Sequence, residues 1–160
     1  AWLFPLTRLP AALELWHIGW FRDLTSTAPW AFWHRWRPDA VLLGGSDFHN
    51  DEHAYLPGTP TTWVAAEDRS VDALFAAVLA GRTAISIGPA PGLPVLLRVG
   101  DELVAIDADG SVLVDVEGRR RPVRGTQHRF RADATGGPDA AGVAPYRLEA
   151  ASRTLLAVSP

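Results

Sequence analysis

The sequence of 160 residues contains no cysteine, no methionine and no lysine. Without cysteine there is neither a disulfide framework nor a thiolate metal site, so a bound metal has to be held by His, Asp and Glu side chains. The 15 basic residues are therefore all arginines, and 18 acidic residues bring the formal net charge to −3. A charge of this sign gives no electrostatic footprint for nucleic acid, and we expect no nucleic-acid partner.

Long apolar runs are missing as well. No stretch approaches the roughly 20 apolar residues that cross a bilayer, and the first residues lack the basic and apolar regions of a signal peptide. We therefore expect no membrane partner, with the cytoplasm as the default compartment. The chain begins abruptly at Ala1 without a methionine, from which we infer a fragment or a chain whose beginning is not represented.

The first half of the chain has the pattern of an α/β layer. Apolar and β-branched residues predict strands at 12–16, 40–43, 61–65 and 83–87. Between the last two, apolar residues at helical spacing predict a helix that Ser70 caps and Gly81 ends. A second, short helix is expected at 29–36, where Pro29 would take the first helical position. Alternation of strand and helix is typical of an α/β fold.

The pattern changes after the proline-rich stretch at 89–94. Short alternating runs replace the helical period, and Asp109-Gly110 is a two-residue hairpin signal between the runs at 103–108 and 112–116. Further strands are predicted at 127–131, 146–150 and 154–158. We predict two units, an α/β part over 1–90 and a small antiparallel β sheet or sandwich over 95–160.

The strongest candidate for chemistry is Gly44-Gly45-Ser46-Asp47-Phe48-His49. It follows a strand predicted to be buried on both faces, and α/β folds place their sites at the carboxyl ends of such strands. In an extended segment, residues two apart point the same way, so Asp47 and His49 would form a pair of metal ligands. The alternative is a polar turn in which Asp47 caps a loop and His49 is solvated.

Three segments, VLLGGSDFHN, PGTPTTWV and LAGRTAISIGP, resemble in this order the last third of a polymerase-and-histidinol-phosphatase (PHP) domain. The nearest branch contains carbamate and other ester hydrolases. The resemblance implies that residues 1–90 are the C-terminal part of a PHP-type βα barrel and that the β-rich remainder is an extension. It also implies that Asp47 and His49 match the Asp and His ligands of the last PHP metal motif.

Other residues are weaker candidates. The segment ALELWH resembles a neighbouring strand of that family, which brings Glu14 and His17 to the site, although His17 stands where Asn is more usual. Glu14 has either a site-lining or a structural role. His53, four residues after His49, is either a substrate contact or a surface histidine. His34 is expected to pack among aromatic residues.

The sequence departs from the PHP pattern in one large respect, since it has no His-x-His pair. Two ligands fall short of the three that a catalytic zinc-type site usually takes from the protein. We therefore expect an incomplete site, which a missing N-terminal segment or a partner chain would complete, and a chain that is nearly inactive alone.

The implied function is hydrolysis of a small-molecule ester, a phosphoester first and a carbamate or carboxyl ester second, assisted by two or three divalent ions. Mixed nitrogen and oxygen donors suit zinc, manganese or iron without choosing among them. The alternative is a non-catalytic PHP remnant that binds a partner or a carbohydrate through its tryptophans, of which there are seven. The sequence leaves the substrate and the oligomeric state open.

Overall fold

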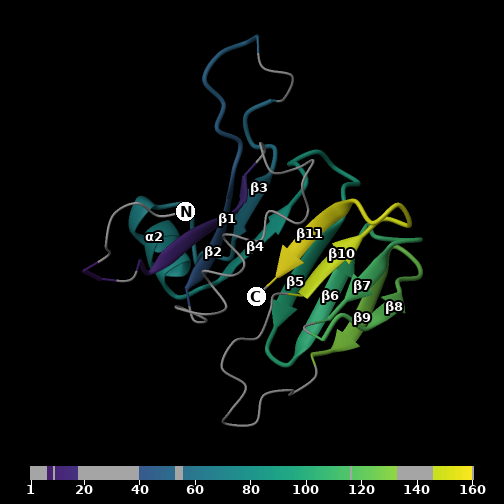
Figure 1. The fold of residues 1–160 in the computed structure, drawn as a ribbon. Helices are drawn as coiled ribbons and strands as arrows, with labels where there is room; N and C mark the ends of the chain where they lie inside the picture. Colours follow the sequence, from purple (N-terminus) through teal and green to yellow (C-terminus); the bar gives the residue numbers. More distant parts are fainter. Residues whose placement is uncertain are drawn as a thin grey trace.

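The computed structural model describes residues 7–8, 10–17, 40–52, 56–115, 117–132 and 146–159. Within these ranges the chain is built mostly of strands (Figure 1). Its elements are β1 (Ala12–His17), β2 (Val41–Gly45), β3 (Thr61–Val64), α2 (Val71–Leu79), β4 (Thr83–Ser86), β5 (Val95–Val99), β6 (Glu102–Ile106), β7 (Val112–Val114), β8 (Arg120–Pro122), β9 (Gln127–Arg131), β10 (Tyr146–Glu149) and β11 (Leu155–Ser159). The short helix expected at 29–36 and His34 lie outside the described residues.

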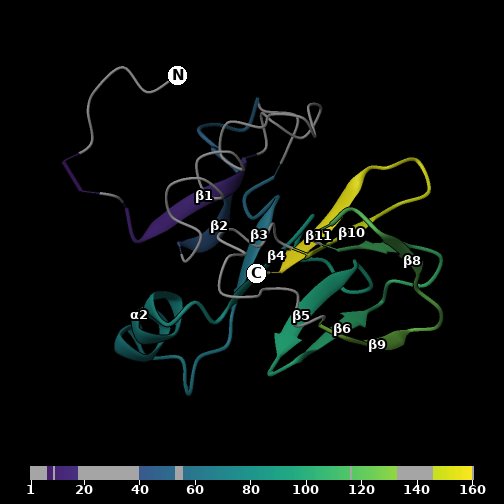
Figure 2. The ribbon, with the colours of Figure 1, turned by 60° about the horizontal axis from the view of Figure 1, so that its bottom comes forward.

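These strands form three sheets. The largest has the order β3-β4-β11-β10-β7-β8, and a smaller one has the order β5-β6-β9. All neighbours in both sheets are antiparallel. The third sheet is the parallel pair β1-β2. It lies beside β3 and β4, as Figures 1 and 2 both show.

The expected βα barrel is therefore wrong for the described part of the chain. A barrel needs parallel strands joined by helical crossovers, whereas β4 returns antiparallel to β3 after α2 and then pairs antiparallel with β11. The local elements were predicted well, since a strand, a helix and a strand do occur at 61–64, 71–79 and 83–86. The prediction failed in the direction of the second strand, which the alternation of elements alone does not determine.

The helix α2 is also not packed as a helix of a βα barrel would be. Ser70 caps it as predicted, since the Ala73 N–H donates to Ser70 Oγ over 3.2 Å. Its apolar stripe is only partly buried, however, with Ala77 inside. The side chains of Val71, Phe75 and Leu79 are mostly exposed. A helix of a βα barrel would bury this stripe against the strands.

Two clusters of buried side chains form the core. One is built from β5, β6, β7, β9, β10 and β11 and their connections, with Leu96, Leu113 and Tyr146 among its members. The other joins the parallel pair to the large sheet through residues that include Trp16, Ile85 and Val158. The large sheet thus contains strands from both sides of the boundary predicted at 89–94, because β4 pairs with β11.

The hairpin predicted at Asp109-Gly110 is also wrong. The chain does turn there, and Gly110 has a positive φ of 76°. The strands on either side nevertheless belong to different sheets, β6 to the small one and β7 to the large one. The reason lies in the hydrogen bonds. The Gly110 N–H donates to Val123 O, and Asp107 N–H to Thr126 O, so the segment before β9 takes the bonds that a hairpin partner would take.

No helix among the described residues is both long and apolar enough to cross a bilayer.

Candidate functional site

The carboxyl ends of β1 and β2 lie side by side. The two strands are parallel, and His17 at the end of β1 is in register with Gly45 at the end of β2. Parallel strands bring polar residues that follow their carboxyl ends to the same edge. His17 therefore comes close to Asp47, two residues beyond β2, and the distance from His17 Nε2 to Asp47 Oδ2 is 3.6 Å.

An irregularity in β1 adds Glu14 to this edge. The register with β2 shifts between Glu14 and Trp16, so that Leu15 is an additional residue in the manner of a β-bulge. In a regular strand, residues three apart would point to opposite faces. The shift instead brings Glu14 Oε1 to 3.0 Å from His17 Nδ1. Leu15 and Trp16 are both buried, and their burial holds the bulge in place.

The contact with Glu14 determines how His17 presents its ring. An ionised carboxylate only accepts hydrogen bonds, so the Nδ1 atom of His17 carries the hydrogen that is donated to Glu14. The lone pair of a neutral His17 is then on Nε2, the atom that faces Asp47. Carboxylate, imidazole and metal ion follow one another in this order in many metal sites, where the carboxylate orients the ring.

Asp47 and His49 approach each other through a turn rather than an extended segment. Asp47 has a φ of 50°, in the left-handed region that Asp and Asn visit more readily than most residues. His49 Nδ1 lies 2.5 Å from Asp47 O and 3.6 Å from Asp47 Oδ1. The carboxylate of Asp47 thus lies between two imidazoles, with one oxygen toward His17 and the other toward His49. Both Asp47 and His49 are exposed.

Two glycines make room for this arrangement. A Cβ on Gly45 would lie 2.6 Å from Glu14 Oε1, so the carboxylate of Glu14 rests where a side chain of β2 would otherwise be. A Cβ on Gly44 would lie 2.6 Å from Ile85 Cγ2, on the side where β2 packs against β4. Gly44 is therefore required by close approach to the core, whereas a side chain at Gly45 would displace the flexible carboxylate of Glu14 from the site.

Two threonines of the large sheet hold β2 by hydrogen bonds to its backbone. Thr62 Oγ1 accepts the Gly44 N–H over 2.8 Å and donates to Gly44 O over 3.0 Å. Thr83 Oγ1 donates to Leu42 O over 3.0 Å. These side chains fix the strand that leads into Asp47. Their role was missed in the sequence, because a threonine in a strand is ordinary and the partner lies up to 41 positions away.

The donor atoms suit a divalent ion in type, and the pair His17–Asp47 suits it in spacing. Two donors about 2.1 Å from one ion at a tetrahedral angle lie about 3.4 Å apart. The separation of His17 Nε2 from Asp47 Oδ2 is 3.6 Å and fits this value. The 3.6 Å between His49 and Asp47 Oδ1 is measured from Nδ1, the nitrogen that contacts Asp47 O. Within the described ranges, however, no three His, Asp or Glu side chains are grouped so that they could hold one ion together. The set is partial, and His53, the other candidate, lies outside those ranges.

Trp16, one of the tryptophans considered for a binding surface, is buried in the core. The tryptophans at positions 20, 30 and 33 lie outside the described residues.

Comparisons with known proteins return no match: no family model, no curated protein and no solved structure matches this chain.

Proposed function

We propose that Glu14, His17, Asp47 and His49 form one corner of the metal site of a hydrolase that acts on phosphoesters or on carbamate and carboxyl esters. The observation that carries the proposal is the chain of contacts from Glu14 Oε1 to His17 Nδ1 and from His17 Nε2 to Asp47 Oδ2, at 3.0 and 3.6 Å. The likeness of VLLGGSDFHN to a PHP metal motif supports hydrolysis as the reaction. The proposed site rests on these local contacts and does not require a βα barrel.

Each side chain has a separate task in this proposal. His17 binds zinc, manganese or iron through Nε2, and Asp47 binds through its carboxylate. Glu14 is a positioning residue that holds the ring of His17. His49 Nδ1 lies 2.5 Å from Asp47 O, so this ring would bind through Nε2. A divalent ion, when bound, supplies polarisation of the ester and a water of lowered pKa.

The remaining ligands come from a second chain or from a segment outside the described ranges. One fitting pair of ligands, with no group of three among the described residues, gives weak binding and does not fix the position of a nucleophilic water. The 160-residue chain alone should therefore bind manganese or zinc weakly and turn over esters very slowly.

Metal binding of single variants tests the proposal. Titration calorimetry with manganese and with zinc should show that His17→Ala and Asp47→Ala each remove binding. Glu14→Ala should weaken it about 10- to 100-fold, as loss of an orienting partner does. Gly45→Ala should act in the same direction, because its Cβ would displace the carboxylate of Glu14. The matched control is His128→Ala, which removes a histidine of the small sheet.

Hydrolysis of 4-nitrophenyl phosphate and a 4-nitrophenyl carbamate, with the same metals, tests the reaction. We expect slow turnover by the chain alone that falls further in Asp47→Ala. Metal binding that is indifferent to both His17→Ala and Asp47→Ala would refute the site. Fast turnover that survives these substitutions would refute the assignment of hydrolysis to it.

A further inference from the structure

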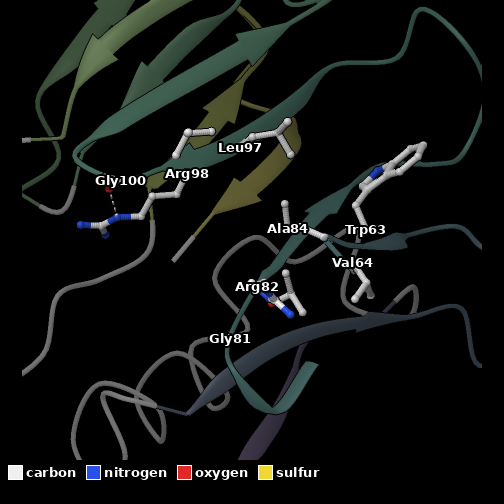
Figure 3. Close-up of a pocket in the computed structure, with 11 residues that line it drawn as sticks. Trp63, Val64, Gly81, Arg82, Ala84, Leu97, Arg98 and Gly100 are labelled. Carbon is white, nitrogen blue, oxygen red and sulfur yellow. Dashed lines mark hydrogen bonds between the residues drawn. The ribbon is translucent and has the colours of Figure 1, made fainter. Parts of the chain in front are cut away.

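The antiparallel pair of β3 and β4 is called the β3–β4 ribbon. A groove lies between this ribbon and β5 (Figure 3). Its volume is about 620 Å³, within the range of small-molecule sites. One side is formed by Trp63 of β3, by Ala84 of β4 and by Arg82, which precedes β4. The other side is formed by residues of β5 that include Leu97 and Arg98. Most of the lining is apolar.

The groove and the Glu14–His17–Asp47 cluster lie on opposite faces of the β3–β4 ribbon. Successive side chains of a strand alternate between the two faces. Thr62 bonds to Gly44 of β2 and so marks the face that carries the cluster. Trp63, the next residue, is paired with Ala84 and lines the groove. The groove is therefore a separate site.

Trp63 gives the groove a fixed aromatic surface. Its indole N–H donates to Ser86 Oγ over 2.7 Å, and Ser86 Oγ in turn donates to Gly88 O. These bonds satisfy the polar atom of the ring and set its orientation. The residue nevertheless remains accessible to a ligand, since 39% of Trp63 is exposed. An oriented and exposed indole is well suited to stack on a flat apolar ligand.

The charged side chains in the lining of the groove are basic. Two arginines, Arg82 and Arg98, line it, and none of the described residues that line it is acidic. Arg82 precedes β4 by one residue and is two residues from Ala84, so its side chain leaves the ribbon on the same face as Ala84 and Trp63. An aromatic surface and a guanidinium thus lie on one wall. Charge complementarity selects an anion for the polar end of the ligand.

Arg82 is able to accept an additional anionic partner. Its Nη1 donates to Glu67 Oε1 over 3.0 Å, and both side chains are exposed. An exposed pair of this kind contributes little stability. A guanidinium has five N–H donors, so a ligand carboxylate can bind beside Glu67 or replace it.

We propose that this groove binds a small aromatic carboxylate, with its ring against Trp63 and its carboxylate on Arg82. The probe is 2-naphthoate, compared with 2-naphthamide, which has the same rings and no charge. Titration calorimetry should give a dissociation constant for naphthoate about tenfold lower than for naphthamide, the size expected for one hydrogen-bonded charge.

Two substitutions at the anionic end should act in opposite directions. Arg82→Gln should remove the preference for naphthoate and leave naphthamide binding unchanged. Glu67→Gln should tighten naphthoate binding severalfold, because it removes the competing carboxylate from Arg82. The matched control is Arg129→Gln, which breaks another exposed ion pair, to Glu102, on a strand outside the groove.

The aromatic wall is tested by Trp63→Ala, which should weaken both probes, and by Trp63→Phe, which keeps an aromatic ring and should retain most of the binding. Circular dichroism and the unfolding midpoint of each variant show whether it is folded. Wild-type protein that does not bind naphthoate overturns the proposal, as does a preference for naphthoate that survives Arg82→Gln.

Discussion

Replacing Asp115 by asparagine should destabilise the protein through one buried carboxylate. Asp115 follows β7 and is only 1% exposed. Its Oδ1 accepts the backbone N–H groups of Glu117 and Arg119 over 2.9 and 2.8 Å, and its Oδ2 accepts Arg119 Nε–H over 2.6 Å. These bonds shape the turn from β7 to β8. Asparagine keeps one oxygen for the two backbone groups but places an NH₂ group against the guanidinium.

The loss can be estimated from the bond that changes. Hydrogen bonds to charged groups contribute roughly 1.5–3 kcal/mol, so Asp115→Asn should lower the free energy of unfolding by about 2 kcal/mol. Urea denaturation at pH 7, followed by circular dichroism, measures it. Glu117→Gln is the matched control. Glu117 also contacts Arg119, at 3.2 Å, but is exposed, and the loss there should be small.

The same carboxylate predicts a dependence on pH. Burial raises the pKa of Asp115, but the hydrogen bonds from the Arg119 side chain and backbone and from Glu117 N–H outweigh it, and the net pKa lies below its ordinary value of 3.8. Its contribution is therefore complete above that value and is lost as the pH falls through the lower, folded-state pKa. The difference between wild type and Asp115→Asn should shrink at acidic pH. A difference that is negligible at pH 7 would refute the reasoning.

Three further predictions concern packing and anchoring, each measured by urea denaturation unless stated. Gly44→Ala should lower the free energy of unfolding by about 1–3 kcal/mol, because the added Cβ would meet Ile85 Cγ2 at 2.6 Å. Burial raises the pKa of Glu149, but the hydrogen bonds and charges of Arg120 and Arg147 outweigh it, and the net pKa lies below its ordinary value of 4.5. Glu149→Gln should therefore be destabilising above pH 4.5 and less so as the pH falls through the folded-state pKa. Thr62→Val should loosen β2 and weaken manganese binding in calorimetry, with binding of naphthoate unchanged.

The sequence predicted local elements better than their partners. Strands at 12–17, 41–45, 61–64 and 83–86 and the helix at 71–79 follow the apolar pattern closely. Strand direction and sheet membership are decided by contacts between distant residues. The pairing of Ile85 with Val158 is an example, since no property of either residue selects the other. The apolar pattern therefore could not predict that β4 and β11 belong to one sheet.

The candidate site shows the same division. Asp47 and His49 were selected by their place after a strand, and the structure puts His49 Nδ1 3.6 Å from Asp47 Oδ1. The pattern left the role of Glu14 open, because its alternation with Leu13 and Leu15 allows it to face either the site or the solvent, and in a regular strand it would point away from His17. The bulge that joins the two depends on how Leu15 and Trp16 are both buried. Two consecutive apolar residues in a strand with one polar face are a weak signal of such a bulge.

The β3–β4 ribbon links the two proposed sites and also keeps them apart. Thr62 and Thr83 bond to the strand that leads to Asp47, whereas Trp63 lines the groove on the other face. The side chains of Thr62 and Trp63 thus act on different sites although they are adjacent, whereas Thr83 both bonds to Leu42 O and lies in the lining of the groove. A substitution that preserves the ladder should affect one face at a time, as adjacent side chains of a strand share a backbone but not their contacts. Loss of both binding activities together would instead indicate that the ribbon itself has moved.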